Sequence, residues 1–378
     1  MHLEGCDAMS KLKIKGKRLK LWISVLLLIT LVVITMASIF KDFSISEFAN
    51  ILNGAQFKYI FIALIMVVLY IFFESVAFKI VMRVLKHKIS WKGSFVYSSV
   101  DYFFSGITPS ATGGQPFQVF YMKKDGVPIH KSTIGILLNT TFYKIVLIVL
   151  GITSAIFFPE FLEETGTIGI ILFILGLLIN VACIVICLMS IYCKNIIKSV
   201  GHFFLNKLAK FKIIKNIDKK ILSFDKKMED YNRSARYLNE NKYVGVALFL
   251  VNLVQRLCLF SITYLVYLAL VPTPTHSIYY LMALQIIVAL CVDSMPFPGG
   301  TGLSELLLST LFASVYFGES LLTSALLLTR GINFYFTLLF TGLIVLINHI
   351  RLIFKNRSRI DIHEELDDKI LDKDVIKC

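Results

Sequence analysis

The stretch that decides the fold is residues 166–193, GTIGIILFILGLLINVACIVICLMSIYC, which has no Asp, Glu, Lys or Arg over its 28 residues. The hydrocarbon core of a bilayer is about 30 Å thick, and an α-helix rises about 1.5 Å per residue. A helix of about 20 apolar residues is therefore long enough to cross the membrane. The sequence predicts a transmembrane helix here.

Similar apolar runs flank this stretch on both sides. They are 21–40, 59–82, 132–158, 243–271 and 321–350. The whole chain is 56% hydrophobic and 17% charged, whereas soluble domains are about 25% charged. We therefore predict an all-α integral membrane protein with six spanning helices. The run 21–40 follows basic residues as a secretory signal does, but it is 20 residues long and lacks a good small-residue cleavage site, so we expect it to be retained.

Two further apolar segments are interrupted by glycine and proline. Residues 93–121 are broken at 107–116, and residues 278–317 are broken at 296–302. Proline lacks an amide donor and disrupts a helix, while glycine permits backbone angles that other residues avoid. We expect each segment to form a broken re-entrant hairpin instead of a simple spanning helix.

The basic residues predict the orientation of the chain. Five segments hold 31 of the 39 Lys and Arg residues, namely 1–20, 79–92, 121–131, 194–242 and 351–359. Cytoplasmic loops are enriched in these residues, so both termini are predicted to be cytoplasmic. The first hairpin then enters from the cytoplasm and the second from outside.

This orientation divides the chain into segments with distinct roles. A basic N-terminus, 1–20, precedes a first membrane half, 21–158. A second half, 159–350, contains the long basic connection 194–242, and a cytoplasmic tail, 351–378, ends the chain. The connection is predicted to form amphipathic helices on the membrane surface or a solvated helical hairpin.

The two halves have the same order of elements but opposite orientation, which is typical of an inverted repeat. Gly114 and Gly300 lie 186 residues apart (300 − 114), and so do Lys144 and Arg330 (330 − 144). In such repeats, paired broken segments meet near the midplane of the membrane and form a substrate site.

The net charge of +14 does not indicate nucleic-acid binding, because the basic residues lie between membrane runs. Membrane lipids, either anionic or aminoacylated, are the expected partners. A homo-oligomer and a separate lipid synthase remain open as further partners. The seven cysteines and seven histidines are dispersed without ligand spacing, so we expect neither a metal site nor another cofactor.

The first break is rich in polar residues. Its sequence, residues 101–116, is DYFFSGITPSATGGQP. Backbone groups that are freed at membrane depth must be satisfied by protein or by water in a cavity. The candidate substrate-binding residues are Asp101, Thr108, Pro109, Thr112, Gly113, Gly114 and Gln115. The alternative is a structural kink that is sealed by its own hydroxyl groups.

The second break, residues 293–305, reads DSMPFPGGTGLSE. Its Gly-Gly-Thr-Gly run is not followed by Gly-Lys-Ser/Thr, so a Walker phosphate loop is excluded. The amides at the start of the next helix could still bind an anion. The candidates here are Asp293, Pro298, Gly299, Gly300, Gly302 and Glu305.

Ionisable residues inside the apolar segments cost about 2.5–3.5 kcal/mol each at a helix centre, so they should be paired or face a wet cavity. They are Glu74, Asp101, Lys144, Arg256, Asp293, Glu305 and Arg330. Arg256 and Arg330 are the strongest candidates for binding phosphate, because guanidinium binds it in a bidentate manner. Purely structural ion pairs are the alternative, and Glu74 and Lys144 are weaker candidates. No catalytic motif is found, so no catalytic residue is expected.

The two breaks resemble the signatures of a known family. TPSATGGQP at 108–116, followed by YMKKDG at 121–126, resembles the first signature of the lysylphosphatidylglycerol synthase transmembrane region family. PGGTGLSE at 298–305 resembles its second signature. Arg330, within LTRGINFY at 328–335, resembles the arginine of its last helix. The resemblance extends over residues 20–350.

In the multiple peptide resistance factor, this region is the flippase half, which moves aminoacylated phosphatidylglycerol to the outer leaflet. The resemblance therefore implies a lipid translocase in the bacterial plasma membrane. Full-length synthases carry a soluble transferase domain after the membrane region, and this chain ends too soon for one, so lysyl transfer is not expected. Two alternatives remain open: a phosphatidylglycerol lysyltransferase or its accessory, and a transporter of ions or small solutes.

Overall fold

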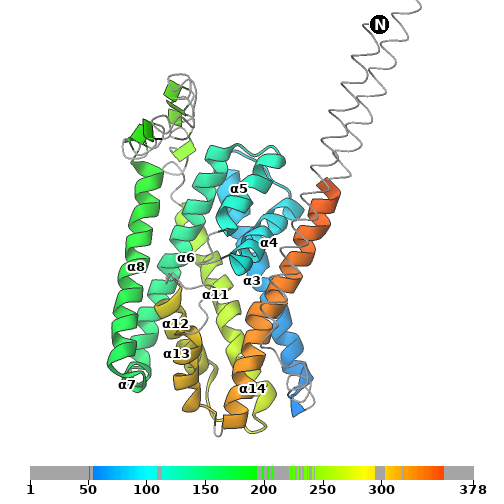
Figure 1. Ribbon diagram of the computed structural model, residues 1–378, viewed down its shortest axis with the longest axis vertical. Helices are drawn as coiled ribbons and strands as arrows, with labels where there is room; N and C mark the ends of the chain where they lie inside the picture. Colours follow the sequence, from blue (N-terminus) through cyan, green and yellow to red (C-terminus); the bar gives the residue numbers. More distant parts are fainter. Residues whose placement is uncertain are drawn as a thin grey trace, which may run out of the picture. The chain divides into compact units, whose positions relative to one another are not determined.

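The computed structural model describes residues 54–108, 113–193, 243–293, 303–316 and 319–352, with residue 51 and scattered positions between 198 and 241. Every element in these ranges is a helix (Figure 1). The described residues up to Leu339 belong to one compact unit, and 340–352 belong to a second. The predicted span 21–40, the N-terminus 1–20 and the tail beyond residue 352 lie outside the described residues.

Five of the predicted spans are present as helices of sufficient length and apolarity. They are α3 (Phe57–Val84), α6 (Ile129–Phe157), α8 (Gly166–Tyr192), α11 (Tyr243–Leu270) and a helix over Ser320–Leu352. The last begins with α14 (Glu319–Arg330) and continues through a π-helical stretch, η4 (Gly331–Phe336). A short helix, α7 (Glu160–Glu164), connects α6 to α8. The prediction of an all-α membrane protein is confirmed.

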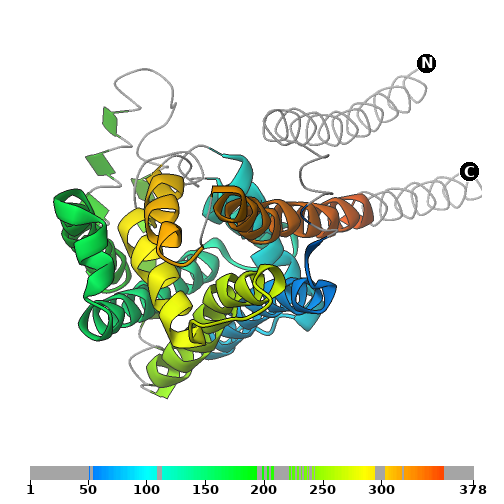
Figure 2. The same cartoon turned by 90° about the horizontal axis from the view of Figure 1, so that it is seen from below.

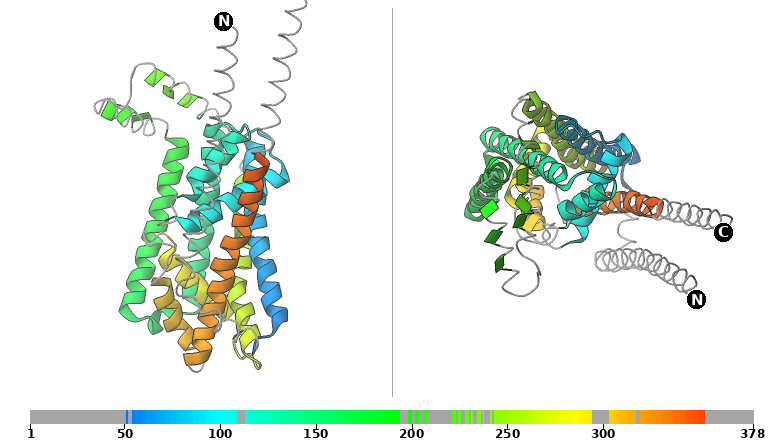
Figure 3. Two further views of the ribbon diagram at one scale, coloured as in Figure 1. Left: turned by 45° about the vertical axis from the view of Figure 1, so that its right-hand side comes forward. Right: turned by 90° about the horizontal axis from the view of Figure 1, so that it is seen from above.

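The two broken segments each contain a pair of short helices. The first pair is α4 (Trp91–Ile107) and α5 (Gly114–Lys124), and the second is α12 (Ile278–Val292) and α13 (Leu303–Ala313). None of the four reaches the roughly 20 residues that a span needs. Figures 1 and 3 show the two pairs near opposite ends of the bundle. Whether each pair re-enters the membrane from one side stays a prediction.

Helix packing follows the predicted repeat. In the first half, α3 packs on α4 and α6, and α5 packs on α6; in the second half, α11 packs on α12 and α14, and α13 packs on α14. Close contacts are also paired: Gly151 of α6 lies against Leu290 of α12, and Gly106 of α4 lies against Leu338 of the last helix. Adding 186 to the number of Gly151 gives position 337, and subtracting 186 from that of Leu290 gives position 104. These two positions lie within two residues of Leu338 and Gly106, which form the second contact.

The helices α3 and α11 pack along one another in an extensive contact at one edge of the bundle (Figure 2). They run antiparallel, because the amide of Gln56, just before α3, donates to the carbonyl of Ala269 near the end of α11 at 2.9 Å. Arg256 Nη1 lies 3.5 Å from the Tyr70 hydroxyl, and these residues are also 186 apart (256 − 70). Equivalent residues touch where a two-fold axis passes. This point lies at the middle of both helices.

Candidate functional site

Arg256, on α11, lies between two aromatic side chains. Its guanidinium carbon is 3.8 Å from the ring centre of Tyr143 on α6 and 5.5 Å from that of Tyr70 on α3. A cation over a ring face is stabilised by the ring quadrupole, and more strongly where water is excluded. Its Nε is buried and has no hydrogen-bond partner within the described part of the chain. The rings therefore hold the cation at the crossing of α3 and α11.

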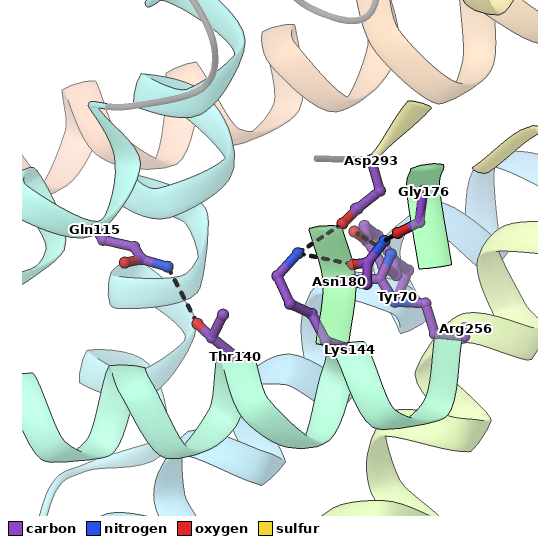
Figure 4. A network of polar contacts seen from close by, with 8 residues as sticks. All are labelled: Tyr70, Gln115, Thr140, Lys144, Gly176, Asn180, Arg256 and Asp293. Carbon is purple, nitrogen blue, oxygen red and sulfur yellow. Dashed lines mark hydrogen bonds and ion pairs between the residues drawn. The ribbon is translucent and has the colours of Figure 1, made fainter. Parts of the chain in front are cut away.

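Lys144, on α6, lies at the centre of a second group of polar contacts (Figure 4). Its Nζ is 2.9 Å from Asp293 Oδ2 at the end of α12 and donates to Asn180 Oδ1 on α8 at 3.0 Å. Asn180 in turn donates to the carbonyl of Gly176 at 2.9 Å. The lysine is only 7% exposed, so these partners compensate for its lost hydration. The ion pair joins α6 to the edge of the second break.

Glu74, on α3, forms a third part of the same interior. It is 6% exposed and accepts a hydrogen bond from Gln255 Nε2 of α11 at 3.3 Å. Gln255 Nε2 also lies 2.9 Å from the hydroxyl of Tyr102 on α4, and Tyr102 is hydrogen-bonded to Glu74. Asp101, the neighbour of Tyr102, interacts electrostatically with Glu74. These contacts connect α3, α4 and α11.

The first break is closed locally by Thr108. Its hydroxyl donates to the carbonyl of Phe104 at 2.6 Å and accepts from the amide of Gly113 at 2.9 Å. Gly114, the first residue of α5, is buried so closely that an added methyl group would overlap Asp101 and Ser105. Gln115 is exposed and donates to Thr140 of α6 at 3.1 Å (Figure 4). The Thr108 hydroxyl thus connects the end of α4 with the residue that precedes α5.

A cavity of about 310 Å³ adjoins these groups. It lies between α3, α4, α11, α12 and η4 and is largely apolar, with Tyr70 and Tyr102 in its wall. Asn333 and Phe334 of the π-helical stretch also line it, and Asn333 Oδ1 is buried without a partner among the described residues. π-Helical turns are frequent at functional sites. The cavity offers a small amphiphilic space beside the buried charges.

The structure brings together only part of the predicted site. Asp101, Gly114, Arg256 and Asp293 lie in or beside this interior. Arg330 ends α14, with its guanidinium carbon 6.0 Å from the ring centre of Tyr335. Pro109, Thr112, Pro298, Gly299, Gly300 and Gly302 lie outside the described residues, as does the side chain of Glu305, whose backbone belongs to α13.

Other residues are more central than the sequence indicated. Arg256, Lys144, Glu74 and the polar side chains that they contact form a buried cluster. Glu74 and Lys144 were weaker candidates than the arginines, but both have several polar contacts in it. The neutral residues were not predicted at all: Tyr70, Tyr102, Tyr143, Asn180 and Gln255. Asn180 and Gln255 are amides inside apolar runs, which is a signal that the sequence already contains. The tyrosines give no such signal, because aromatic residues are common throughout these helices.

A family described as lysylphosphatidylglycerol synthase TM region matches residues 21–341. This range includes both broken segments and every residue of the buried cluster. A search of curated proteins gives no significant match.

Proposed function

Because the chain belongs to the lysylphosphatidylglycerol synthase transmembrane region family, we propose that it translocates a phospholipid across the bacterial plasma membrane. The expected substrate is aminoacylated phosphatidylglycerol or a related lipid. The chain is a multi-pass membrane protein, and its family is tied to lysylphosphatidylglycerol metabolism or lipid translocation. The polar interior of the bundle supports translocation as the activity of this chain.

The observation that carries the proposal is the position of the buried charges. Glu74, Arg256 and Lys144 come from three apolar helices, and Asp293 comes from the edge of the second break. A lipid headgroup crosses hydrocarbon slowly because its charges lose hydration there. A polar interior flanked by two broken segments supplies alternative partners, while the acyl tails remain in the bilayer.

The mechanism we propose follows from the repeat. The headgroup enters the interior from one leaflet while the α4–α5 or the α12–α13 pair moves aside. The two halves then rock about the α3–α11 contact and open the interior to the other leaflet. Arg256 contributes a guanidinium at the crossing point, where a lipid phosphate can bind in a bidentate manner.

The test uses purified protein in vesicles that contain fluorescent phosphatidylglycerol, with a membrane-impermeant quencher outside. We expect the protein to expose inner-leaflet lipid to the quencher. Arg256→Gln should lose most of this activity, whereas Arg351→Gln, at an exposed position near the end of the last helix, should retain it. Equal lipid exposure in both variants would remove Arg256 from the pathway.

Two other outcomes would replace the proposal. Uptake of ions or small solutes without lipid movement would identify a solute transporter. A new aminoacyl lipid, detected by mass spectrometry in cells that express this chain alone, would identify a lysyltransferase activity. Each assay is independent of the fluorescent lipid measurement.

A further inference from the structure

The carboxyl groups of Glu74 and Asp101 form an acidic pair in the interior of the bundle. Glu74 is contacted by Gln255 and Tyr102, and Asp101 is hydrogen-bonded to Ser105 one helical turn later. Glu74 and Asp101 interact electrostatically although α3 and α4 supply them separately. Glu74 lies one helical turn from Tyr70 at the α3–α11 crossing.

The charges around this pair do not balance when both carboxyls are ionised. Within the described ranges, Lys144 is paired with Asp293, and Arg256 is the cation that interacts with Glu74. Two carboxylates that interact electrostatically in a poorly solvated interior disfavour double ionisation. The titratable groups that face the pair are Tyr70 on α3, Tyr102 on α4 and Arg256 on α11, with Tyr143 and Lys144 of α6 beyond the guanidinium.

The hydrogen bonds around the pair also indicate that one carboxyl group carries a proton. Asp101 Oδ1 and Gln255 Oε1 are buried, and neither has a donor within the described ranges. Gln255 is 2% exposed, so bulk water does not reach its amide. An unpaired buried acceptor costs about 1–3 kcal/mol. A proton on one carboxyl turns an acceptor into a donor and removes one of these deficits.

A metal ion fits the site less well than a proton does. The described residues contain no group of three or more His, Cys, Asp and Glu side chains that could hold a metal. The neighbours of the pair are two tyrosines, a serine, an amide and a guanidinium, and the guanidinium would repel a cation. A proton adds to a carboxylate oxygen without needing further ligands.

The pair also contacts the moving parts that the proposed function invokes. Tyr102 is hydrogen-bonded to Glu74 and forms part of the cavity wall. Gly114, at the start of α5, packs directly against Asp101. An occupant of the cavity and a movement of the first broken segment would therefore both change the surroundings of the carboxyls.

We propose that Glu74 and Asp101 share one proton that is bound and released in each translocation cycle. Lipid movement is thereby driven by the transmembrane proton gradient. With the proton bound, the pair carries one negative charge, which Arg256 balances. After release, the second negative charge favours a state in which the interior is open to water or to a headgroup. This inference rests on the proposed function and adds its energy source.

The proton site is tested directly by infrared spectroscopy of the full-length protein in lipid at different pH values. We expect a protonated carboxyl band that disappears as the pH rises. Glu74→Gln and Asp101→Asn should each abolish this titrating band, whereas Glu163→Gln, a change of an exposed acid in α7, should leave it unchanged. A band that survives in both interior variants, or is absent from the wild type, would overturn the proton site.

The coupling is tested in vesicles with an imposed pH gradient. One exchanged proton per lipid should change the ratio of fluorescent lipid between leaflets by up to about tenfold per pH unit. The effect should vanish in Glu74→Gln, and a sodium gradient should have no effect. Lipid movement that ignores the pH gradient, or follows sodium instead, contradicts this inference but leaves lipid translocation intact. Absence of any lipid movement in the wild type contradicts the proposed function itself.

Discussion

Lys144 shows how an ion pair inside the membrane fixes a junction between helices. Its ammonium group contacts Asp293 at 2.9 Å and Asn180 at 3.0 Å, and both partners come from other helices. The lysine side chain is 9% exposed and that of Asp293 is 20% exposed. Asp293 is thus the more exposed member of the pair. The buried Lys144 depends on Asp293 to balance its charge. The residue ranked as a weak candidate in the sequence has the best-defined polar contacts in the interior.

We predict that Asp293→Asn alone destabilises the protein more than Asp293→Asn combined with Lys144→Met. The single variant leaves the buried Lys144 without its counter-ion, and such a loss costs about 3–5 kcal/mol for a fully buried pair. Exposure of Asp293 lowers this expected cost. Thermal unfolding in detergent should show a marked loss of stability for Asp293→Asn and partial recovery for Asp293→Asn with Lys144→Met. Equal stability of the single and double variants would show that the pair does not support the fold.

At the scale of elements, glycine permits the close approach of α8 to α12. A methyl group on Gly176 would run into the carbonyl of Leu290 on α12, and a backbone group cannot move aside as a side chain can. The same contact positions Asn180, one turn later, to meet Lys144. The helix α12 is apolar and buried over most of its length, as expected for an element surrounded by others.

Gly176→Ala should therefore separate α8 from α12. Overpacking of this kind costs about 1–3 kcal/mol. Gly54→Ala provides the matched control, because no atom lies within 4 Å of the added methyl group. Thermal unfolding measures both variants. If Gly176→Ala is as stable as Gly54→Ala, the close approach of these two helices is not required.

The elements could be predicted from the sequence more completely than the site. The spans depend on length and apolarity, and the breaks depend on glycine and proline, so both are local properties. The partners of Lys144 and Arg256 depend on how each helix is rotated about its axis. Sequence spacing does not determine that rotation across 149 residues, the separation of Lys144 from Asp293. The 186-residue spacing was the one long-range signal, and Tyr70 and Arg256 meet at that spacing.

At the scale of the whole molecule, the charge distribution predicts an orientation. Lys124 ends α5 and Glu163 lies in α7, and Figure 1 shows these helices at opposite ends of the described bundle. Both side chains are exposed. By the positive-inside rule, the end with Lys124 faces the cytoplasm.

Cysteine labelling of intact cells tests this orientation. In a background without the native cysteines, an impermeant reagent should modify Glu163→Cys but not Lys124→Cys. Permeabilised cells provide the control, because both positions should then react. Labelling of Lys124→Cys in intact cells would reverse the orientation or exclude the predicted entry of the first hairpin from the cytoplasm.

We propose that a lipid headgroup enters the interior of this bundle, and crosslinking measures that entry most directly. The probe is phosphatidylglycerol with a photoreactive group on its headgroup, reconstituted with the full-length protein. Mass spectrometry of the crosslinked peptides should identify cavity-lining positions in mid-membrane, such as Tyr102 and Phe334. Leu250, which is 53% exposed on α11, should not be modified, because acyl tails surround it. Crosslinks confined to the ends of the spanning helices would contradict the claim.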